Sequence, residues 1–302
     1  MHFPIEPGWT TRFAPAPTGW LHLGHVVNAA YVWGLARAFG GRVLLRIEDH
    51  DRARCRPEYE AGLLDDLDWL GFVPDRGDTR EFRAGPHPQR QSDAGARYER
   101  ALARLVERGL VYACDCSRRS IAEATPVAEG EEPRYTNRCR ERGLDFSATA
   151  ARRILLDDGE ECFDDLRLGP QSQSPARQCG DLLARDRLGY WTYQFAVTVD
   201  DLEQGVDVII RGEDLLESTG RQFQLARLLG RERMPRVLHH PLLRKPGGQK
   251  LSKSAGDTGV RDLRAAGMTP AQVIGRAVHL AGLTERERPV AVDDLPSLFA
   301  EG

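Results

Sequence analysis

The first 70 residues alternate between short apolar runs and longer stretches with helical spacing. Residues 10–14 predict a strand, which the proline-rich turn at 15–19 ends. Apolar side chains recur at helical spacing over residues 25–39, residues 42–49 predict a buried strand that ends in carboxylates, and residues 57–70 predict an amphipathic helix. Strand, turn, helix, strand and helix in this order form a βαβ unit. The pattern therefore predicts an α/β fold of the Rossmann type, with a doubly wound nucleotide-binding sheet.

A similar pattern returns in the last third of the chain. Residues 192–200 and 206–211 predict strands, residues 217–229 predict a helix, and residues 237–243 predict a last strand. Polar residues with proline and glycine fill 125–139, which predicts a loop outside the core. An insertion in the sequence therefore separates the two halves of the predicted sheet.

This division gives three regions. Residues 1–100 and 185–258 are expected to form one split Rossmann-type domain, and residues 101–184 an inserted subdomain. Residues 259–302 are expected to form a short helical C-terminal region. Its helix should begin at Thr269–Pro270, because threonine is a good N-cap and proline suits the first helical position.

Composition and charge limit the setting in which the chain works. Hydrophobic residues make up 41% and charged residues 29% of the 302 residues, which is ordinary for a soluble globular protein. No apolar run reaches transmembrane length, and the N-terminus lacks the layout of a signal peptide, so we expect a cytoplasmic protein without a membrane contact. The net charge of −3 argues against a large nonspecific contact with nucleic acid.

The segment His22-Leu23-Gly24-His25 stands where the first predicted helix begins. Gly24 allows the backbone to approach a nucleotide at the helix N-terminus, and the two imidazoles can donate hydrogen bonds to a triphosphate. The alternative is a pair of surface histidines beside a helix start. Because small nucleotidyltransferases also carry HxGH, the motif alone indicates adenylyl transfer.

Lysine is almost absent from the chain. Of 42 basic residues only three are lysines, and all three lie between positions 245 and 253: Lys245, Lys250 and Lys253. Lysine is a compact, flexible point charge, whereas arginine is a planar fork. The segment 250–254 (KLSKS) therefore predicts a loop that contacts a triphosphate. The alternative is a solvated surface loop.

Four polar side chains are expected at strand ends of the same sheet: Arg12, Glu48, Tyr193 and Arg211. Ligands of open α/β sheets bind at the carboxyl ends of the strands. Two arginines and a tyrosine can hold a carboxylate by charge-assisted hydrogen bonds, and Glu48 can hold an ammonium group. The set suits an acidic amino acid. The alternative is a group of surface ion pairs.

Three of the six cysteines, Cys114, Cys116 and Cys139, fall within 26 residues and predict a metal site. Thiolates at this spacing can share one tetrahedral ion, with Tyr135, Asp115 or water as the fourth ligand. The alternative is three incidental reduced thiols. We expect the remaining cysteines to be ordinary buried or half-buried thiols: Cys55, Cys162 and Cys179.

Taken in order, these motifs resemble the catalytic half of the glutamyl-tRNA synthetases, in the glutamate and glutamine branch of the class I synthetases. The resemblance extends over residues 10–258. It rests on five segments: 11–19, 46–49, 199–201, 210–215 and 250–254.

Only 48 residues follow Ser254, which we expect to be too few for an anticodon-binding domain. With the Cys-x-Cys and Tyr-x-x-x-Cys segments, this resembles the short glutamyl-queuosine tRNA(Asp) synthetase family. The resemblance implies a monomeric ligase that activates L-glutamate with ATP and Mg²⁺, without needing RNA for that step. It then transfers the glutamate to the queuosine base in the anticodon loop of tRNA(Asp).

Two alternatives remain. The chain could be the catalytic part of an ordinary glutamyl-tRNA synthetase, which needs tRNA for activation and charges the 3′ end. It could also be a non-catalytic RNA-binding paralog, in which HxGH or KLSKS should be eroded. Both motifs are intact.

The resemblance also implies roles for individual residues. The glutamate site comprises Arg12, Ala14, Ala16, Glu48, Tyr193 and Arg211. ATP is bound by His22, Gly24, His25, Lys250 and Lys253. Three of these residues, His22, His25 and Lys253, act in catalysis. A structural zinc ion is held by Cys114, Cys116, Tyr135 and Cys139. Ala16 replaces the serine usual in the family, which removes a hydrogen bond worth about 1 kcal/mol.

Overall fold

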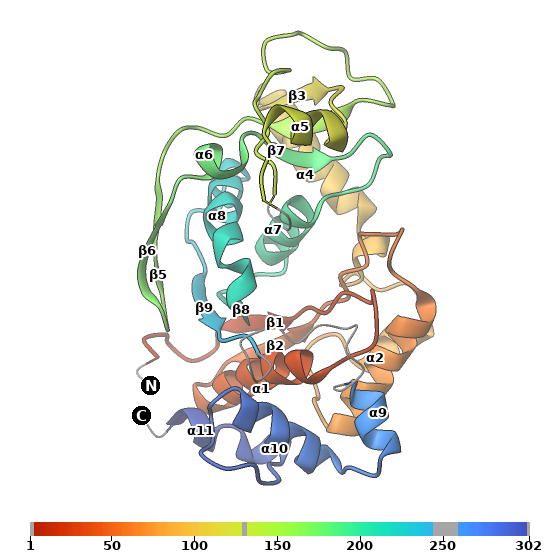
Figure 1. Ribbon diagram of the computed structural model, residues 1–302, viewed down its shortest axis with the longest axis vertical. Helices are drawn as coiled ribbons and strands as arrows, with labels where there is room; N and C mark the ends of the chain where they lie inside the picture. The colour runs from red at the N-terminus through yellow and green to blue at the C-terminus, as the bar shows by residue number, and fades with distance from the viewer. Residues whose placement is uncertain (1–2, 129–131, 244–258, 301–302) are drawn as a thin grey trace.

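The computed structural model describes residues 3–128, 132–243 and 259–300. A parallel sheet lies at its centre (Figure 1). Strands β1 (Thr10–Phe13) and β2 (Arg42–Leu45) pair in parallel and are joined by helix α1 (Leu23–Ala38). Strands β8 (Val208–Gly212) and β9 (Arg236–His240) pair in the same way across the rest of the sheet.

A backbone hydrogen bond ties the two strand pairs to each other. The amide of Asp207, just before β8, donates to the carbonyl of Thr10 in β1 at 2.8 Å. The Asp207 carboxylate in turn accepts the amide of Thr10 at 2.9 Å. The carboxyl ends of β1, β2 and β8 therefore meet at one edge of the sheet, although about 165 residues separate β2 from β8 in the sequence.

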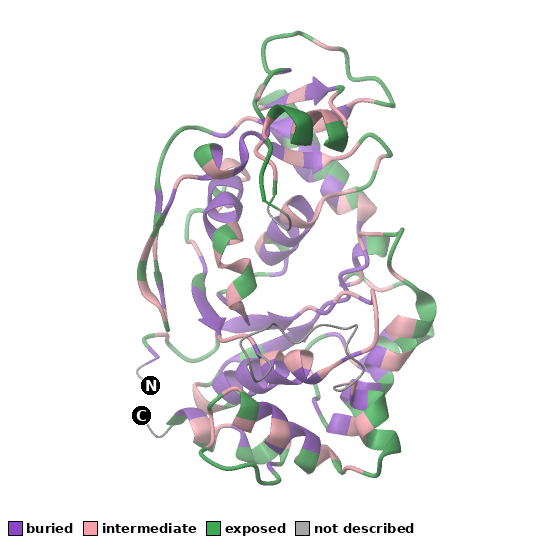
Figure 2. Ribbon diagram, viewed as in Figure 1, coloured by how far each residue is buried: buried purple, intermediate pink, exposed green. Residues whose placement is uncertain are grey.

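Helices cover both faces of this sheet (Figure 1). One face packs against α1, which in turn packs against the C-terminal helices α10 (Pro270–Leu280) and α11 (Ser297–Ala300). The other face lies below α7 (Tyr193–Glu203) and α8 (Thr219–Leu228). Buried residues concentrate on the strands and on the helix surfaces that face them (Figure 2). The remaining N- and C-terminal helices are α2 (Pro57–Leu70), α3 (Thr79–Ala84) and α9 (Val260–Ala265).

The predicted insertion contains one small sheet and a hairpin. An antiparallel sheet orders its strands as β3 (Val111–Cys114), β4 (Ala151–Ile154) and β7 (Leu182–Arg185). A hairpin of β5 (Glu161–Asp165) and β6 (Gly169–Gln173) runs back and joins the central sheet, where Asp165 pairs with Val237 of β9. The helices of this region are α4 (Gly95–Glu107), α5 (Arg118–Ala124) and α6 (Pro175–Cys179), and short 3₁₀ turns occupy Gln91–Asp93, Glu213–Ser218 and Val292–Asp294.

The strand predicted at 192–200 is wrong, since these residues form helix α7. Its apolar residues alternate in sequence, as in a strand, but residues 195–201 are all buried. A helix that is surrounded by other elements carries apolar residues on every side, so periodicity does not separate it from a buried strand. The strands predicted at 42–49 and 237–243 are correct but shorter, and end at Leu45 and His240.

The other predicted elements are confirmed. The N-terminal strand and helix, the helix at 57–70 and the strand at 206–211 appear within a few residues of their expected bounds. Helix α10 begins after Thr269, whose side chain accepts the amide of Gln272 in a capping box. Within the described residues, no helix combines the length and apolar character needed to cross a bilayer.

Candidate active site

The two histidines of the HxGH segment form the N-terminus of α1. His22 is the N-cap, and its Nδ1 accepts the amide of Gly24 at 3.1 Å. The Nδ1 of His25 accepts the amide of His22 at 3.1 Å. Because Nδ1 is the acceptor in both rings, a neutral imidazole must carry its proton on Nε2. An Nε2–H group in this tautomer is a hydrogen-bond donor of the kind that an anion at the helix N-terminus requires.

Gly24 is required by this arrangement. A Cβ atom at this position would lie 2.9 Å from the His22 ring, closer than side chains tolerate. The two imidazole rings themselves lie with their centroids 4.0 Å apart. The glycine therefore permits the ring of His22 to fold back over the first turn of the helix.

The predicted triphosphate loop, with Lys250 and Lys253, lies outside the described residues. The chain that follows it returns to the HxGH segment, because Gly259 forms an antiparallel bridge with His22. The amide of Val260 also donates to the carbonyl of Leu21 at 2.9 Å. The backbone five residues past KLSKS therefore lies beside the HxGH segment.

Arg12, Glu48 and Arg211 converge at the carboxyl edge of the central sheet. Arg12 lies on β1, Glu48 follows β2 and Arg211 lies on β8. The prediction that Tyr193 lies at a strand end is wrong. Tyr193 lies at the N-terminus of α7, above the sheet. Burial and the nearby Glu48 carboxylate raise the pKa of Tyr193, while the cations of Arg211 and Arg12 oppose this shift. The four side chains therefore lie within electrostatic reach of one another.

These charged groups are not surface ion pairs. Arg12 and Arg211 are each 4% exposed and Glu48 is 6% exposed. The Arg12 guanidinium donates to Asp201 at 3.1 Å and to the carbonyl of Ile210 at 3.3 Å. Charged side chains are almost never buried this far without such partners, because removing them from water costs free energy. The arrangement is therefore expected to serve a ligand or a structural network.

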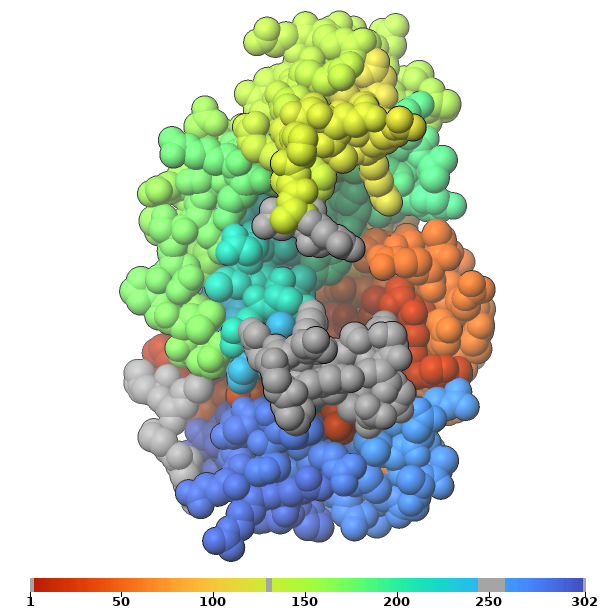
Figure 3. Space-filling view, viewed as in Figure 1, coloured from red at the N-terminus to blue at the C-terminus, as the bar shows by residue number. Residues whose placement is uncertain are grey.

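The surface is hollowed in front of this edge (Figure 3). The N-terminal residues, in red, lie set back between the helices α7 and α8 and the segment that leads into α2. Ala14 and Ala16 lie directly after β1 and are both half-buried. Small side chains at these two positions leave room beside the charged groups.

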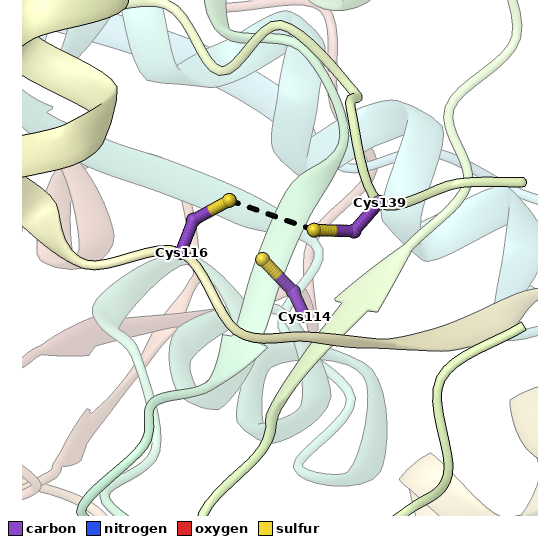
Figure 4. Close-up of side chains that lie close together, drawn as sticks. All are labelled: Cys114, Cys116 and Cys139. Atoms are coloured by element: carbon purple, nitrogen blue, oxygen red, sulfur yellow. Dashed lines mark hydrogen bonds between the residues drawn. The ribbon is translucent and has the colours of Figure 1, made fainter. Parts of the chain in front are cut away.

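The three cysteines of the predicted metal site lie together in the insertion (Figure 4). Their sulfur atoms all lie within 4.8 Å of one another, and those of Cys116 and Cys139 are 3.5 Å apart. Two thiolates on one tetrahedral zinc ion are about 3.8 Å apart, so the described geometry suits such an ion. The Tyr135 hydroxyl lies 3.4 Å from the sulfur of Cys114, and Asp115 lies 3.3 Å from that of Cys139.

The surroundings of the cluster correct two expectations. Tyr135 and Cys139 are buried in a small hydrophobic cluster, so the loop predicted at 125–139 is not wholly outside the core. Among the other cysteines, Cys55 is half-buried and Cys179 buried as expected, but Cys162 is exposed. It lies on β5, where alternate side chains face solvent.

Comparison with known proteins agrees with this geometry. A family model described as the catalytic domain of the class I tRNA synthetases (E and Q) matches residues 9–293. The glutamyl-Q tRNA(Asp) synthetase of Symbiobacterium thermophilum is 42% identical over 300 residues, which cover 95% of this chain and 91% of that protein. The protein of the same name from Rhodobacter capsulatus is 42% identical, with 87% and 97% covered. The chain belongs to the glutamyl-Q tRNA(Asp) synthetase family.

Solved structures place the fold of this family member among the glutamate-specific class I enzymes. The structure of a glutamate tRNA ligase from Elizabethkingia meningosepticum, in complex with its amino acid, is 26% identical with a TM-score of 0.77. The match covers 95% of this chain and 64% of the ligase, so the chain spans less than two thirds of the larger enzyme. The predicted α/β class is confirmed.

The sequence analysis missed the network that holds the charged groups of this family member. Arg46 is fully buried and donates to Glu48 at 2.9 Å, to Asp201 at 2.7 Å and to Gln204 at 3.0 Å. Asp201 bridges Arg46 and Arg12, and although burial opposes its ionisation, these two arginines hold its pKa below the usual value. Arg46 and Asp201 therefore orient Arg12 and Glu48.

A signal for this network was present in the sequence. Arg46 interrupts the run Leu44-Leu45-Arg46-Ile47, and Asp200-Asp201 directly follow an apolar run. A charged residue inside an apolar run has two possible explanations. Either the strand or helix ends there and the side chain reaches solvent, or the side chain is buried beside a partner of opposite charge. Opposite charges in two separate apolar segments, Arg46 in one and Asp200-Asp201 at the end of the other, could have indicated the second case.

Proposed function

We propose that this family member activates L-glutamate with ATP and transfers it to the queuosine base of tRNA(Asp). The observation that carries the proposal is the buried pair Arg12 and Arg211, with Tyr193 and Glu48, at the carboxyl edge of the sheet. The named relatives support the nucleic-acid substrate, because they match over most of their own length.

The first step joins glutamate to AMP. Glu48 holds the α-ammonium group, and Arg211 binds the side-chain carboxylate, with Arg12 and Tyr193 completing the pocket. The α-carboxylate then attacks the α-phosphate of ATP, which forms glutamyl-adenylate and releases pyrophosphate. Positioning and charge stabilisation account for the rate, and no protein nucleophile takes part.

The triphosphate lies at the N-terminus of α1. The Nε2–H groups of His22 and His25 donate to its oxygens, and Gly24 allows its close approach. Lys250 and Lys253 supply positive charge to the triphosphate, and Mg²⁺ accompanies the ATP. A hydroxyl of queuosine then attacks the mixed anhydride and AMP leaves.

We further propose that the insertion, residues 101–184, is a subdomain with one structural zinc ion. Cys114, Cys116 and Cys139 supply three thiolates, and Tyr135 is the fourth ligand because its hydroxyl lies between Cys114 and the amide of Cys139. Asp115 is the competing donor, but Arg142 binds it at 2.7 Å. Residues 1–100 and 185–258 then form the catalytic domain, with 259–302 packed beneath it.

The test is to locate the transferred glutamate. The enzyme is incubated with ATP, labelled glutamate and tRNA(Asp) that contains queuosine, and the digested RNA is examined by mass spectrometry. We expect label on the queuosine nucleoside, and the same yield on tRNA(Asp) whose 3′-terminal adenosine has been removed. Label that requires the 3′ adenosine, or that appears on tRNA(Glu), would instead identify an ordinary glutamyl-tRNA synthetase activity.

A further inference from the structure

A histidine that the proposed chemistry does not use lies directly behind Arg211. His239 is on β9, next to β8, and its side chain is completely buried. Its Nε2 lies 3.0 Å from the Nε of Arg211, and its Nδ1 lies 2.6 Å from a carboxylate oxygen of Asp165. The three residues therefore form a continuous chain of hydrogen bonds from β5 through β9 to β8.

The direction of each hydrogen bond in this chain is fixed by chemistry. The Nε of arginine can only donate, so the Nε2 of His239 accepts. The ring proton is then on Nδ1, which donates to the carboxylate of Asp165. An ionised carboxylate can only accept, so Asp165 permits one tautomer of His239, the one that accepts from Arg211.

The surroundings hold both groups in these protonation states. Asp165 also accepts the amides of Arg167 at 2.9 Å, Leu168 at 2.8 Å and His239 at 3.1 Å. Burial raises the pKa of Asp165, but the side-chain hydrogen bond from His239 and the amides of Leu168 and Arg167 hold it below the usual value. Burial lowers the pKa of His239, with the cation of Arg211 acting in the same direction and Asp165 against it. A neutral His239 is therefore the stable form beside the guanidinium.

Arg211 makes two further hydrogen bonds to side chains of α8. Its Nη1 donates to Gln222 at 2.7 Å, and its Nη2 donates to Thr219 at 2.8 Å. With the bond to His239, each guanidinium nitrogen uses one N–H group on a residue of the protein. The hydroxyl of Tyr193 also hydrogen-bonds this guanidinium, and the terminal N–H groups of an arginine match the oxygens of a carboxylate.

We propose that Asp165 and His239 are positioning residues that fix the guanidinium plane of Arg211, so that its terminal N–H groups meet the side-chain carboxylate of glutamate. This rests on the proposed role of Arg211 in glutamate binding. Because Asp165 lies at the end of β5, the hairpin of the insertion contributes to amino-acid selection without touching the substrate.

The experiment measures glutamate-dependent pyrophosphate exchange for two substitutions at one position. The amide of His239→Asn reaches the place of Nδ1 and keeps the bond to Asp165, but it loses the acceptor for Arg211. His239→Gln reaches the place of Nε2 and can still accept from Arg211. We expect the KM for glutamate to rise about tenfold or more for the asparagine variant and less for the glutamine variant, with the KM for ATP unchanged in both.

Asp165→Asn tests the tautomer. Its amide must place an NH₂ group near His239 or against the backbone amides, which disfavours the Nδ1–H form, so the KM for glutamate should again rise by about tenfold. Asp164→Asn is the matched control, because Asp164 is the exposed neighbour on the same strand. Thermal melting of all variants identifies any that unfold. If Asp165→Asn is among them, the proposal is judged on the KM for glutamate of the two His239 variants.

The results separate this proposal from the one on which it rests. If Arg211→Leu abolishes exchange while His239→Asn and Asp165→Asn keep the wild-type KM for glutamate, the positioning role is wrong and the glutamate site stands. The positioning role is also wrong if the KM for glutamate of His239→Asn is equal to or lower than that of His239→Gln. If Arg211→Leu still activates glutamate well, the proposed amino-acid site itself is wrong.

Discussion

At the scale of single residues, the lysines of the KLSKS segment make the sharpest claim. The chain uses arginine for nearly every cationic position yet keeps lysine at 250 and 253. An ammonium group is a compact point charge that can approach phosphate oxygens from many directions, whereas a guanidinium requires a planar fit. The shape and hydrogen-bonding geometry of the side chain, and not its charge alone, should therefore decide whether it can bind the triphosphate at these positions.

Lys253→Arg keeps the charge and should still damage adenylate formation. We expect at least about a tenfold loss in the rate of pyrophosphate exchange, or about 1.4 kcal/mol of transition-state stabilisation. Lys245→Arg, which lies outside the motif, is the matched control and should retain the wild-type rate. Near wild-type exchange by Lys253→Arg would contradict the claim.

At the scale of elements, α9 is important because it is the first helix after the KLSKS segment among the described residues. Two of its arginines stack on tryptophans, Arg261 over Trp20 at 4.3 Å and Arg264 over Trp69 at 5.2 Å. Beneath them on α2, Asp66 is 4% exposed and its Oδ2 has no hydrogen-bond partner among the described residues. Burial raises the pKa of Asp66 to about 6, although Arg264 opposes the shift.

This buried carboxyl group should make stability fall as pH rises. An unfolded aspartate titrates near pH 3.9, so between about pH 4 and 6 only the folded state holds the proton, and folding stability is lost through that window. Asp66→Asn should raise the melting temperature by about 2 °C at pH 7.5 and have little effect at pH 4. Asp65→Asn, an exposed neighbour, should show no such pH dependence. An equal effect of Asp66→Asn at both pH values would reject the assignment.

The small sheet of β3, β4 and β7 carries the cysteine cluster, and its metal content can be measured directly. We expect one zinc ion per chain, lost in Cys114→Ser, because thiolates at this spacing favour zinc over magnesium or calcium. Tyr135→Phe should weaken zinc retention against a chelator, whereas Asp115→Asn should not. The reverse order would make Asp115 the fourth ligand.

The role of that zinc ion is expected to be structural. The cysteines lie in a small cluster with Tyr135 and Ala151, apart from the cluster beneath the central sheet, whereas other apolar residues of the insertion pack against α7 and α8. Chelation should therefore lower the melting temperature of the protein, while the rate of adenylate formation at saturating substrate should change little at temperatures where the protein stays folded. An immediate and complete loss of exchange in metal-depleted but folded protein would contradict a purely structural role.

At the scale of the whole molecule, the proposed amino-acid site is complete within one chain. Arg12, Glu48 and Arg211 are held by residues of the central sheet and its helices, with Arg46, Asp201 and His239 among them. All of these bonds are made within the chain, so we expect glutamate and ATP to find the site in its working arrangement.

Pyrophosphate exchange should therefore proceed with glutamate and ATP alone. Addition of tRNA(Asp) should change its rate by less than about threefold, because no described contact of the site waits for a partner. Exchange that is silent without RNA and restored by tRNA(Glu) would favour an ordinary glutamyl-tRNA synthetase. Glutamine in place of glutamate should give no exchange, since it offers Arg211 an amide instead of a carboxylate.

The sequence by itself determined the local elements and the two motifs, HxGH and KLSKS, proposed to bind ATP. The strand at 10–13, the helix that begins at His22 and the capping box at Thr269 depend on spacing and caps that act within a few residues. The order of those motifs along the chain was also enough to predict the family. Each of these features can be recognised without knowing which distant segments meet.

Only the tertiary structure decided which groups share an environment. Residues 192–200 have the alternation of a strand, but neighbours on every side make them a buried helix. Arg46 meets Asp201 across 155 positions, and His239 meets Asp165 across 74. A buried charge is stable only beside its partners, and those partners are chosen by the packing of distant segments, which local sequence does not encode.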